Sequence, residues 1–321
     1  NSTCNGGNLP GIEQYTYTTV VTLPPCDSWT LSWVGRNRNA AVANLVDPDD
    51  HAMYIATTLN NVVDPCDNST EFTNIASPYV CLNYPVTYSY GAFDVDGDSL
   101  SYALVGALDE FGVPILYVPP YTGLEPISGI TLDPLTGLLS FTPYLAGNWV
   151  VVVEVSAWDS LGNLIGTVMR DMQFIAYPCT NVPPDAATGT VVGTTGTAVQ
   201  TGPNSVDVCE SGDFCFNFQI SDLNANNILT ATSNVGQNLP GATFTYTGTN
   251  PITCTVCWTG SMGTAGFYPF IVTVNDGACP IPAFQTYVYG ITVLPGMFID
   301  IVAVDESCAG TDDGSVSVSV I

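Results

Sequence analysis

The sequence predicts an all-β chain built from tandem β-sandwiches. Short segments alternate apolar with polar residues, turn signals recur at intervals of roughly 8–12 residues, and one plan of segments occurs twice. No long run of Ala, Glu, Lys and Leu indicates a helix. Hydrophobic residues make up 46% of the chain and Thr, Ser, Asn and Gly are abundant, which favours sheets with a neutral polar surface over disorder.

Residues 1–70 are interpreted as an N-terminal β segment, and it stays open whether all its strands are present. Strands are expected at residues 15–23 and 28–33, where apolar or aromatic side chains alternate with Thr and Ser. Arg36 and Arg38 follow, and they are two of the three basic residues in the chain. They indicate either a basic docking site or ion pairs with carboxylates, and the acidic composition favours ion pairs.

Two copies of one plan follow, and we expect a β-sandwich in residues 71–178 and another in 179–296. The second copy repeats the order of the first: an alternating strand, a turn rich in Asp or Asn, and a long apolar strand that ends at an Asp. The strand at 149–155 is almost wholly apolar, which predicts cover on both faces. Residues 297–321 are expected to begin a further β repeat, truncated here, that continues past Ile321.

The charge of the chain excludes several functions. With 29 acidic residues against 3 basic ones, the net charge is −26, so the chain cannot neutralise the phosphates of a nucleic acid. The same charge disfavours an anionic membrane surface, and we expect no membrane span in this region. Such a charge keeps molecules apart and attracts divalent cations.

The strongest site signal is the run Asp94-Val-Asp96-Gly97-Asp98. Three carboxylates at alternate positions repel one another unless a cation lies between them, and Ca²⁺ takes about six to eight oxygen ligands. Gly97 permits the tight turn that such a loop needs. The alternative is a solvated acidic turn without an ion. We expect Asp94, Asp96 and Asp98 to bind Ca²⁺ as the one cofactor of this region.

Further ligands are expected where strands end at the same pole of a sandwich. Asp159 ends the long apolar strand of the first copy, so we expect it to complete the calcium site. A weaker second site is expected at the matching places of the second copy, where amides replace some acids: Asp222, Asn224 and Asp276.

Eleven cysteines indicate a secreted, disulfide-forming protein. Strand parity directs Cys215 and Cys257 away from the core faces of their strands, so they are expected to pair, while Cys254 points into the core as a free thiol. Two more expected pairs bracket short loops: Cys66 with Cys81, and Cys4 with Cys26.

Several stretches resemble one family of secreted proteins. The chain is similar to the Ig-like and cadherin-like modules of large, repetitive Bacteroidota adhesins of the gliding-motility type, which the type IX secretion system exports. The resemblance covers nearly the whole chain and implies an extracellular, cell-surface location. It rests on residues 8–11, 26–29, 36–37, 90–102, 139–143, 164–171, 257–259, 276–280 and 305–316.

Three functions remain as hypotheses. The first is a structural stalk or filament-forming segment of a giant adhesin, whose partners are further domains of the same chain and other copies in fibres. The second is a module that binds surface glycans, for which Trp29, Trp33, Tyr117 and Tyr121 are the aromatic candidates. The third is an accessory region of a secreted enzyme. No catalytic activity is expected in this region, because the only histidine, His51, has no nucleophile motif beside it.

Overall fold

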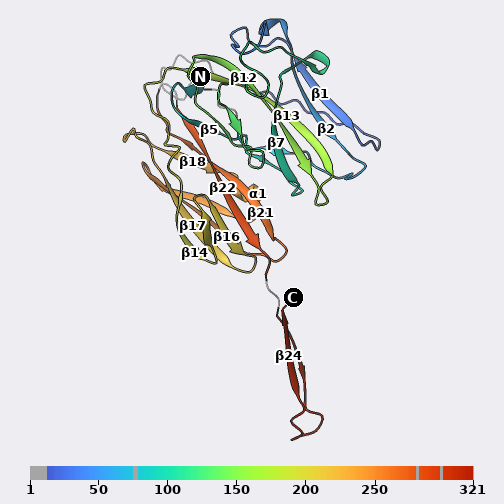
Figure 1. Cartoon of the computed structure of the whole chain (residues 1–321). Coiled ribbons are helices and arrows are strands. Elements are labelled where there is room, and N and C mark those ends of the chain that lie inside the picture. The colour runs from blue at the N-terminus through green and yellow to red at the C-terminus, as the bar shows by residue number, and fades with distance from the viewer. Residues whose placement is uncertain (1–12, 75–78, 280–281, 297–298, 321) are drawn as a thin grey trace.

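The computed structural model describes residues 13–74, 79–279, 282–296 and 299–320, and Figure 1 shows the whole chain. Strands hold 47% of the residues and helices 3%, so the expected all-β class is confirmed. Two sandwiches carry most of the chain, and a C-terminal hairpin extends away from the second one (Figure 1).

The first sandwich contains one large sheet. Its strand order is β7-β12-β13-β2-β8-β9, with β1 added beside β2 and β4 beside β13. The strands of this sheet are β1 (Trp29–Gly35), β2 (Met53–Leu59), β4 (Tyr79–Cys81), β7 (Ser99–Val105), β8 (Leu108–Asp109), β9 (Val113–Pro114), β12 (Gly147–Trp158) and β13 (Leu164–Tyr177).

Smaller elements complete the first sandwich. A three-stranded sheet in the order β10-β11-β5 lies on one face of the large sheet, and a two-stranded pair, β3 with β6, leads into the acidic run. These elements are β3 (Glu71–Phe72), β5 (Val86–Tyr88), β6 (Ala92–Phe93), β10 (Thr131–Leu132), β11 (Leu139–Phe141) and the 3₁₀ helices η1 (Pro48–Asp50) and η2 (Glu110–Gly112).

Strand β12 is covered on both faces, as its apolar run predicts. Val151 and Val153 are fully buried on the side of the small sheet, where they join a core that contains Phe174. Val150 and Val152 point the other way and pack in a second core with Leu45. The burial of both faces removes the apolar side chains of β12 from water, which is the main stabilising contribution of such a strand.

The N-terminal segment supplies the second cover of β12. Strand β2 pairs with β13, so strands on both sides of the expected boundary near residue 70 belong to one sheet. The strand expected at 28–33 is present as part of β1. The strand expected at 15–23 is not: residues 15–22 are exposed, so their alternating apolar side chains are not buried against a sheet, and the segment pairs with no strand.

The second sandwich has two facing sheets around one core. Their strand orders are β14-β17-β20-β19 and β15-β16-β22-β21-β18, and the aromatic residues of β17 and β22 meet between them. The elements are β14 (Val191–Gly196), β15 (Val199–Gly202), β16 (Ser205–Cys209), β17 (Asp213–Ile220), β18 (Thr230–Ser233), α1 (Val235–Asn238), β19 (Thr243–Gly248), β20 (Ile252–Thr259), β21 (Gly266–Asn275) and β22 (Phe284–Leu294). The hairpin pairs β23 (Ile299–Val304) with β24 (Ser315–Val320).

The two sandwiches are joined along their sides. The side chain of Thr87 on β5 donates to the carbonyl of Thr286 at 2.6 Å, and its backbone N–H donates to the buried side chain of Gln285 at 3.1 Å. The Asn74 amide also donates to the Thr273 hydroxyl at 3.0 Å. Figure 1 shows β22 and β5 as neighbours. The units therefore lie partly alongside one another, whereas a chain of units stacked end to end would meet only at their poles.

The disulfides differ in part from the sequence expectation. Cys215 and Cys257 are directly opposed on β17 and β20 and form a disulfide, while Cys254 is a buried thiol whose pKa burial raises to about 12. Cys81 bonds to Cys179 and not to Cys66, because β4 runs parallel to the end of β13 and places Cys81 opposite Tyr177.

The states of the remaining cysteines also differ from the sequence expectation. Cys66 and Cys26 are free thiols, so neither takes part in the bond that its short loop suggested. Cys4 lies outside the described residues. Cys279 is also disulfide-bonded. The bond of Cys81 to Cys179 spans 98 residues and fixes the segment between the sandwiches to the first one.

The shared core yields a stability prediction. Replacing Leu45, which is 2% exposed, by Ala opens a cavity against β12 and should cost about 2–5 kcal/mol of unfolding free energy. Urea unfolding measures it, with Val62→Ala as the control because Val62 is 56% exposed. Equal stabilities of the two variants would mean that the N-terminal segment is not part of the folded core.

Candidate metal centre

The pairing of β3 with β6 decides which residues meet the acidic run. These strands are antiparallel, with Glu71 opposite Phe93 and Phe72 opposite Ala92. Residues just before β3 therefore lie beside residues just after β6. The backbone N–H of Asn68 donates to the Asp96 carboxylate at 2.6 Å and fixes this juxtaposition. Asp67 is thereby brought to a loop that lies about 27–31 positions further along the chain, as counting along the sequence gives.

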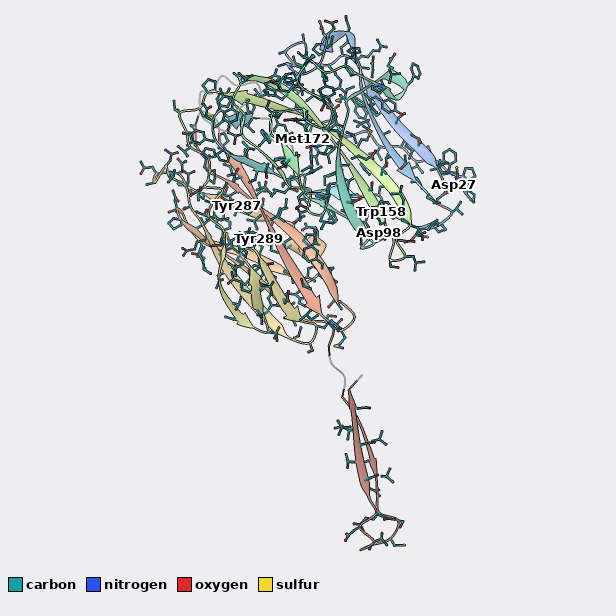
Figure 2. The ribbon with its side chains drawn as sticks, in the orientation of Figure 1. Asp27, Asp98, Trp158, Met172, Tyr287 and Tyr289 are labelled. Carbon is teal, nitrogen blue, oxygen red and sulfur yellow. A yellow bond between two sulfur atoms is a disulfide. The ribbon has the colours of Figure 1, made fainter. Side chains whose placement is uncertain are left out.

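The loop itself turns around Asp94. One oxygen of Asp94 accepts the backbone N–H of Asp96 at 3.0 Å and that of Asp98 at 3.4 Å. Gly97 has φ +87°, a left-handed conformation that glycine adopts without strain. Strand β7 begins at Ser99, which lies opposite Trp158 of β12, so the end of the large sheet holds Asp98 in place. Asp98 and Trp158 mark this end in Figure 2.

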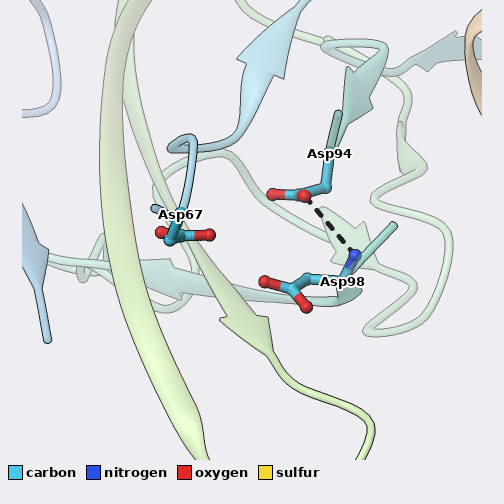
Figure 3. Close-up of side chains that lie close together, drawn as sticks. All are labelled: Asp67, Asp94 and Asp98. Carbon is cyan, nitrogen blue, oxygen red and sulfur yellow. Dashed lines mark hydrogen bonds between the residues drawn. The ribbon is translucent and has the colours of Figure 1, made fainter. Parts of the chain in front are cut away.

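Three carboxylates converge here, as Figure 3 shows: Asp67, Asp94 and Asp98. One oxygen of each lies within 4.8 Å of the other two. Oδ1 of Asp67 and Oδ2 of Asp94 are buried and have no hydrogen-bond partner. Buried polar atoms are normally satisfied, so unsatisfied carboxylate oxygens are the donor set that a hard divalent cation fits.

The raised pKa values of the three carboxyl groups favour the binding of a cation by the cluster. Burial, followed by the charges of Asp94 and Asp98, raises the pKa of Asp67 to about 7. Burial also raises the pKa of Asp94, although backbone N–H groups of the loop act in the opposite direction. The pKa of Asp98 is raised by burial and by Asp94. Without an added positive charge, the cluster therefore retains a proton near neutral pH.

Two of the expected ligands do not belong to this cluster. The carboxylate of Asp96 is occupied by Asn68, which donates to it from its backbone and its side chain. Asp159 accepts the backbone N–H groups of Leu161 and Asn163 and the Asn163 amide. Asp159 lies at the expected end of the sheet, but its carboxylate holds its own turn. Hydrogen bonding from Asn163 lowers the pKa of Asp159, which is the opposite of the shifts in the cluster.

The weaker second site is a hydrogen-bonded network. The carboxylate of Asp276 accepts the Asn181 amide and the backbone N–H groups of Ala278 and Ala283. The other two expected ligands also have partners: Asp222 accepts from Asn224 and Asn227, and Asn224 accepts from Val182. These three side chains are therefore bonded to amides and backbone N–H groups of the chain. Asp276 and Asn224 hold the segment between the sandwiches to the second one through Asn181 and Val182.

The acidic loop faces the second sandwich. A groove of about 370 Å³ lies between the units, with Asp94 and Asp98 on one side and Phe267 and Tyr268 on the other. A cation at the cluster would therefore lie beside the contact between the two units. His51 lies elsewhere, where its ring Nδ1 is 2.8 Å from a carboxylate oxygen of Asp109.

Comparisons with known proteins find only weak structural similarity. No protein-family model matches, and no curated protein is similar to the chain. Similar solved structures include cadherin-like domains 1 to 4 of zebrafish RET (13% identity, 74% of this chain, 59% of that one, TM-score 0.22). They also include the sialic-acid-binding region of a Streptococcus sanguinis adhesin (12%, 72% and 78%, 0.22) and an endo-fucoidan hydrolase of glycoside hydrolase family 107 (11%, 87% and 43%, 0.23). Such low TM-scores carry no argument about function.

The cluster yields a prediction about calcium affinity. Asp67→Asn removes one charge from the donor set and should weaken Ca²⁺ binding by about tenfold or more, because affinity follows the number of charged ligands. Titration calorimetry measures it. Asp159→Asn is the matched control, since the same change is made at the same pole outside the cluster. Equal losses in both variants would show that Asp67 is not a ligand.

The pKa of Asp67 yields a pH prediction for the metal-free chain. Because its pKa is raised to about 7, its contribution to stability is full below the ordinary carboxyl pKa and is lost as pH rises through 7. In EDTA, the melting temperature should fall more from pH 5 to pH 8 in the parent than in Asp67→Asn. A difference of a few degrees is measurable, since 1 kcal/mol shifts Tm by about 2–4 °C in domains of 150–250 residues. If the melting temperatures of the parent and of Asp67→Asn changed with pH in parallel, the raised pKa of Asp67 would be contradicted.

Proposed function

We propose that this region is a structural segment of a large secreted cell-surface adhesin, a stalk or filament-forming part that Ca²⁺ and disulfides stiffen. One observation carries the proposal: the two sandwiches are fixed to each other, and the carboxylate cluster, in which Asp67 and Asp94 each keep an unsatisfied oxygen, reaches the groove between them through Asp94 and Asp98. A stalk has to resist bending between its units, and this contact is where such resistance would arise.

The first junction is held by covalent and polar contacts. The Cys81–Cys179 bond fixes the start of the connecting segment, and Asn181 holds the same segment to Asp276 of the second sandwich. Across the interface, the Gln285 side chain donates to the carbonyl of Pro85 at 3.3 Å while it accepts from Thr87. Independent motion of the sandwiches would break these partly buried hydrogen bonds, which cost free energy when they are left unmade.

Calcium would add a contact that depends on the calcium concentration. Asp67, Asp94 and Asp98 would hold the ion, whose charge would offset their mutual repulsion. The loop would then keep a single shape against Phe267 and Tyr268 in the groove. Extracellular calcium is a suitable source for such a site, since modules outside cells bind it with dissociation constants of about 10⁻⁴–10⁻³ M.

The C-terminal end of the second sandwich is also held by hydrogen bonds. One oxygen of Glu210 accepts the backbone N–H of Gly296 at 2.9 Å, and the other accepts Gly263 and Ala265. Hydrogen bonding from Gly296 is the main reason that the pKa of Glu210 lies below its usual value. The start of the segment that leads to the hairpin is therefore tied to the sandwich before it. Further units of the same chain would follow in a defined direction.

Several features support an extracellular, cell-surface place for this segment. Disulfides form and persist in oxidising compartments. Among the residues that the structure describes, no helix is long and apolar enough to cross a membrane. The net charge of −26 opposes close lateral contact between copies, so association into fibres would need cations or a specific patch. The resemblance to type IX-secreted adhesins of the gliding type has the same implication.

Small-angle X-ray scattering of the chain tests the proposal. In excess CaCl₂ we expect one rigid shape, and in EDTA a larger radius of gyration with signs of motion between the units. Asp67→Asn should scatter in CaCl₂ as the parent does in EDTA, and Asp159→Asn should respond like the parent. The proposal fails if the units move independently in CaCl₂, or if EDTA leaves the scattering unchanged.

A further inference from the structure

A pocket lies where two strands of the large sheet separate. Pairing between β2 and β13 covers Leu59, Thr58 and Thr57 and does not continue toward Met53. Arg38 bridges the gap: its guanidinium donates to Asp171 at 2.7 Å and to the carbonyls of Ala52 and Leu108. The side chains of this ion pair are only 3% and 4% exposed. They form the floor of a pocket of about 440 Å³, within the size range of small-ligand sites.

Trp33 forms one wall of the pocket. A Cβ atom at position 35 would lie 2.2 Å from Cη2 of Trp33, so only glycine at this position lets the indole lie flat against β1. The backbone supports the ring from one side, and 38% of the residue stays exposed. A supported, partly exposed ring attracts C–H groups, because the face of an aromatic ring carries partial negative charge.

The rest of the pocket lining is partly apolar, from Val42, Met53 and Val150, and partly polar. Asn37, Asn39 and Gln173 line the pocket with amide side chains. The Asn37 amide nitrogen already donates to the Asp49 carbonyl and the Asn39 oxygen accepts the Ala41 N–H, so Asn37 offers its oxygen as an acceptor and Asn39 its nitrogen as a donor.

Arg36 also lines the pocket, but its guanidinium is paired with Glu110, just as Arg38 is paired with Asp171. Both arginines confirm the ion-pair interpretation of the sequence. Their charges are therefore already engaged by carboxylates of this chain.

This combination fits one class of ligand. We propose that the pocket binds a neutral glycan, with a pyranose ring stacked on Trp33 and its hydroxyls bonded to the amides of Asn37, Asn39 and Gln173. Hydroxyls donate and accept, as these amides do, and a pyranose face presents the C–H groups that an indole attracts. An acidic glycan is a poorer match, because the arginines are paired and the chain carries a net charge of −26.

The other aromatic candidates from the sequence have different roles. The Trp29 indole donates to the carbonyl of Pro24, and the Tyr117 hydroxyl accepts the backbone N–H of Ala107. Tyr121 packs edge-on against Trp149 at a centroid distance of 5.0 Å. Trp33 is therefore the aromatic residue around which the glycan site is built, and Trp29 on the same strand provides a matched control.

An array experiment tests the proposal with the full chain. The labelled chain is applied to immobilised neutral oligosaccharides that end in glucose, galactose, mannose or N-acetylhexosamine, and to sialylated and sulphated ones. The best neutral oligosaccharide is then titrated in solution by calorimetry. Trp33→Ala should weaken binding by about tenfold or more, since buried aromatic anchors dominate such contacts. Gln173→Ala should weaken it severalfold, and Trp29→Ala should bind like the parent.

The results of these experiments distinguish a neutral-glycan site from the alternatives. Near-ultraviolet circular dichroism and the melting temperature establish that each variant is folded, and Gln173→Ala tests the pocket even if Trp33→Ala unfolds. Binding to neutral oligosaccharides that depends on Trp33 and Gln173 supports the proposal. Binding only to sialylated or sulphated glycans, binding that survives both substitutions, or no binding to any neutral oligosaccharide overturns it. None of these results depends on calcium-dependent stiffness.

Discussion

The burial of β12 on both faces is the constraint on which the rest of the structure depends. A strand with apolar side chains on both sides needs two covers, and the small sheet can supply only one. Leu45 of the N-terminal segment supplies the other together with Ala107 and Ile115, and β1 and β2 of the same segment belong to the large sheet. This arrangement also positions the two candidate sites. Asp98 and the acidic loop lie at one end of the large sheet, and the pocket beside Trp33 lies on the face that the N-terminal segment covers.

The charged side chains differ in whether the fold gives them a partner. Two of the three arginines, Arg36 and Arg38, pair with carboxylates, and Asp276 and Asp159 accept from amides and backbone N–H groups. Asp67 and Asp94 are different, since each keeps a buried oxygen without a partner. Like charges held together by the fold raise one another's pKa and cost stability unless a cation or a proton is added. Asp94 and Asp98 of this cluster also line the groove between the sandwiches.

Local patterns in the sequence predict much of this structure, and contacts between distant segments account for what they miss. Strand parity places Cys215 opposite Cys257 and Cys254 in the core, and the Asp94–Asp98 run marks the loop. Asp67 has no spacing signature, because only the β3–β6 pairing brings it to that loop. Asp159 does reach the expected end of the sheet, but a position on a strand does not reveal that its carboxylate holds its own turn. The Cys81–Cys179 bond was likewise hidden, since it follows from the parallel pairing of β4 with β13.

We propose that Asp67, Asp94 and Asp98 share one calcium ion beside the contact between the sandwiches. The decisive experiment is a crystal of the chain grown in CaCl₂ and measured at a wavelength with anomalous calcium signal. We expect one anomalous peak between the three carboxylates, at about 2.3–2.6 Å from their oxygens, and its absence in Asp67→Asn crystals. A water molecule or no density at that place, with the loop unchanged, would contradict the shared calcium site.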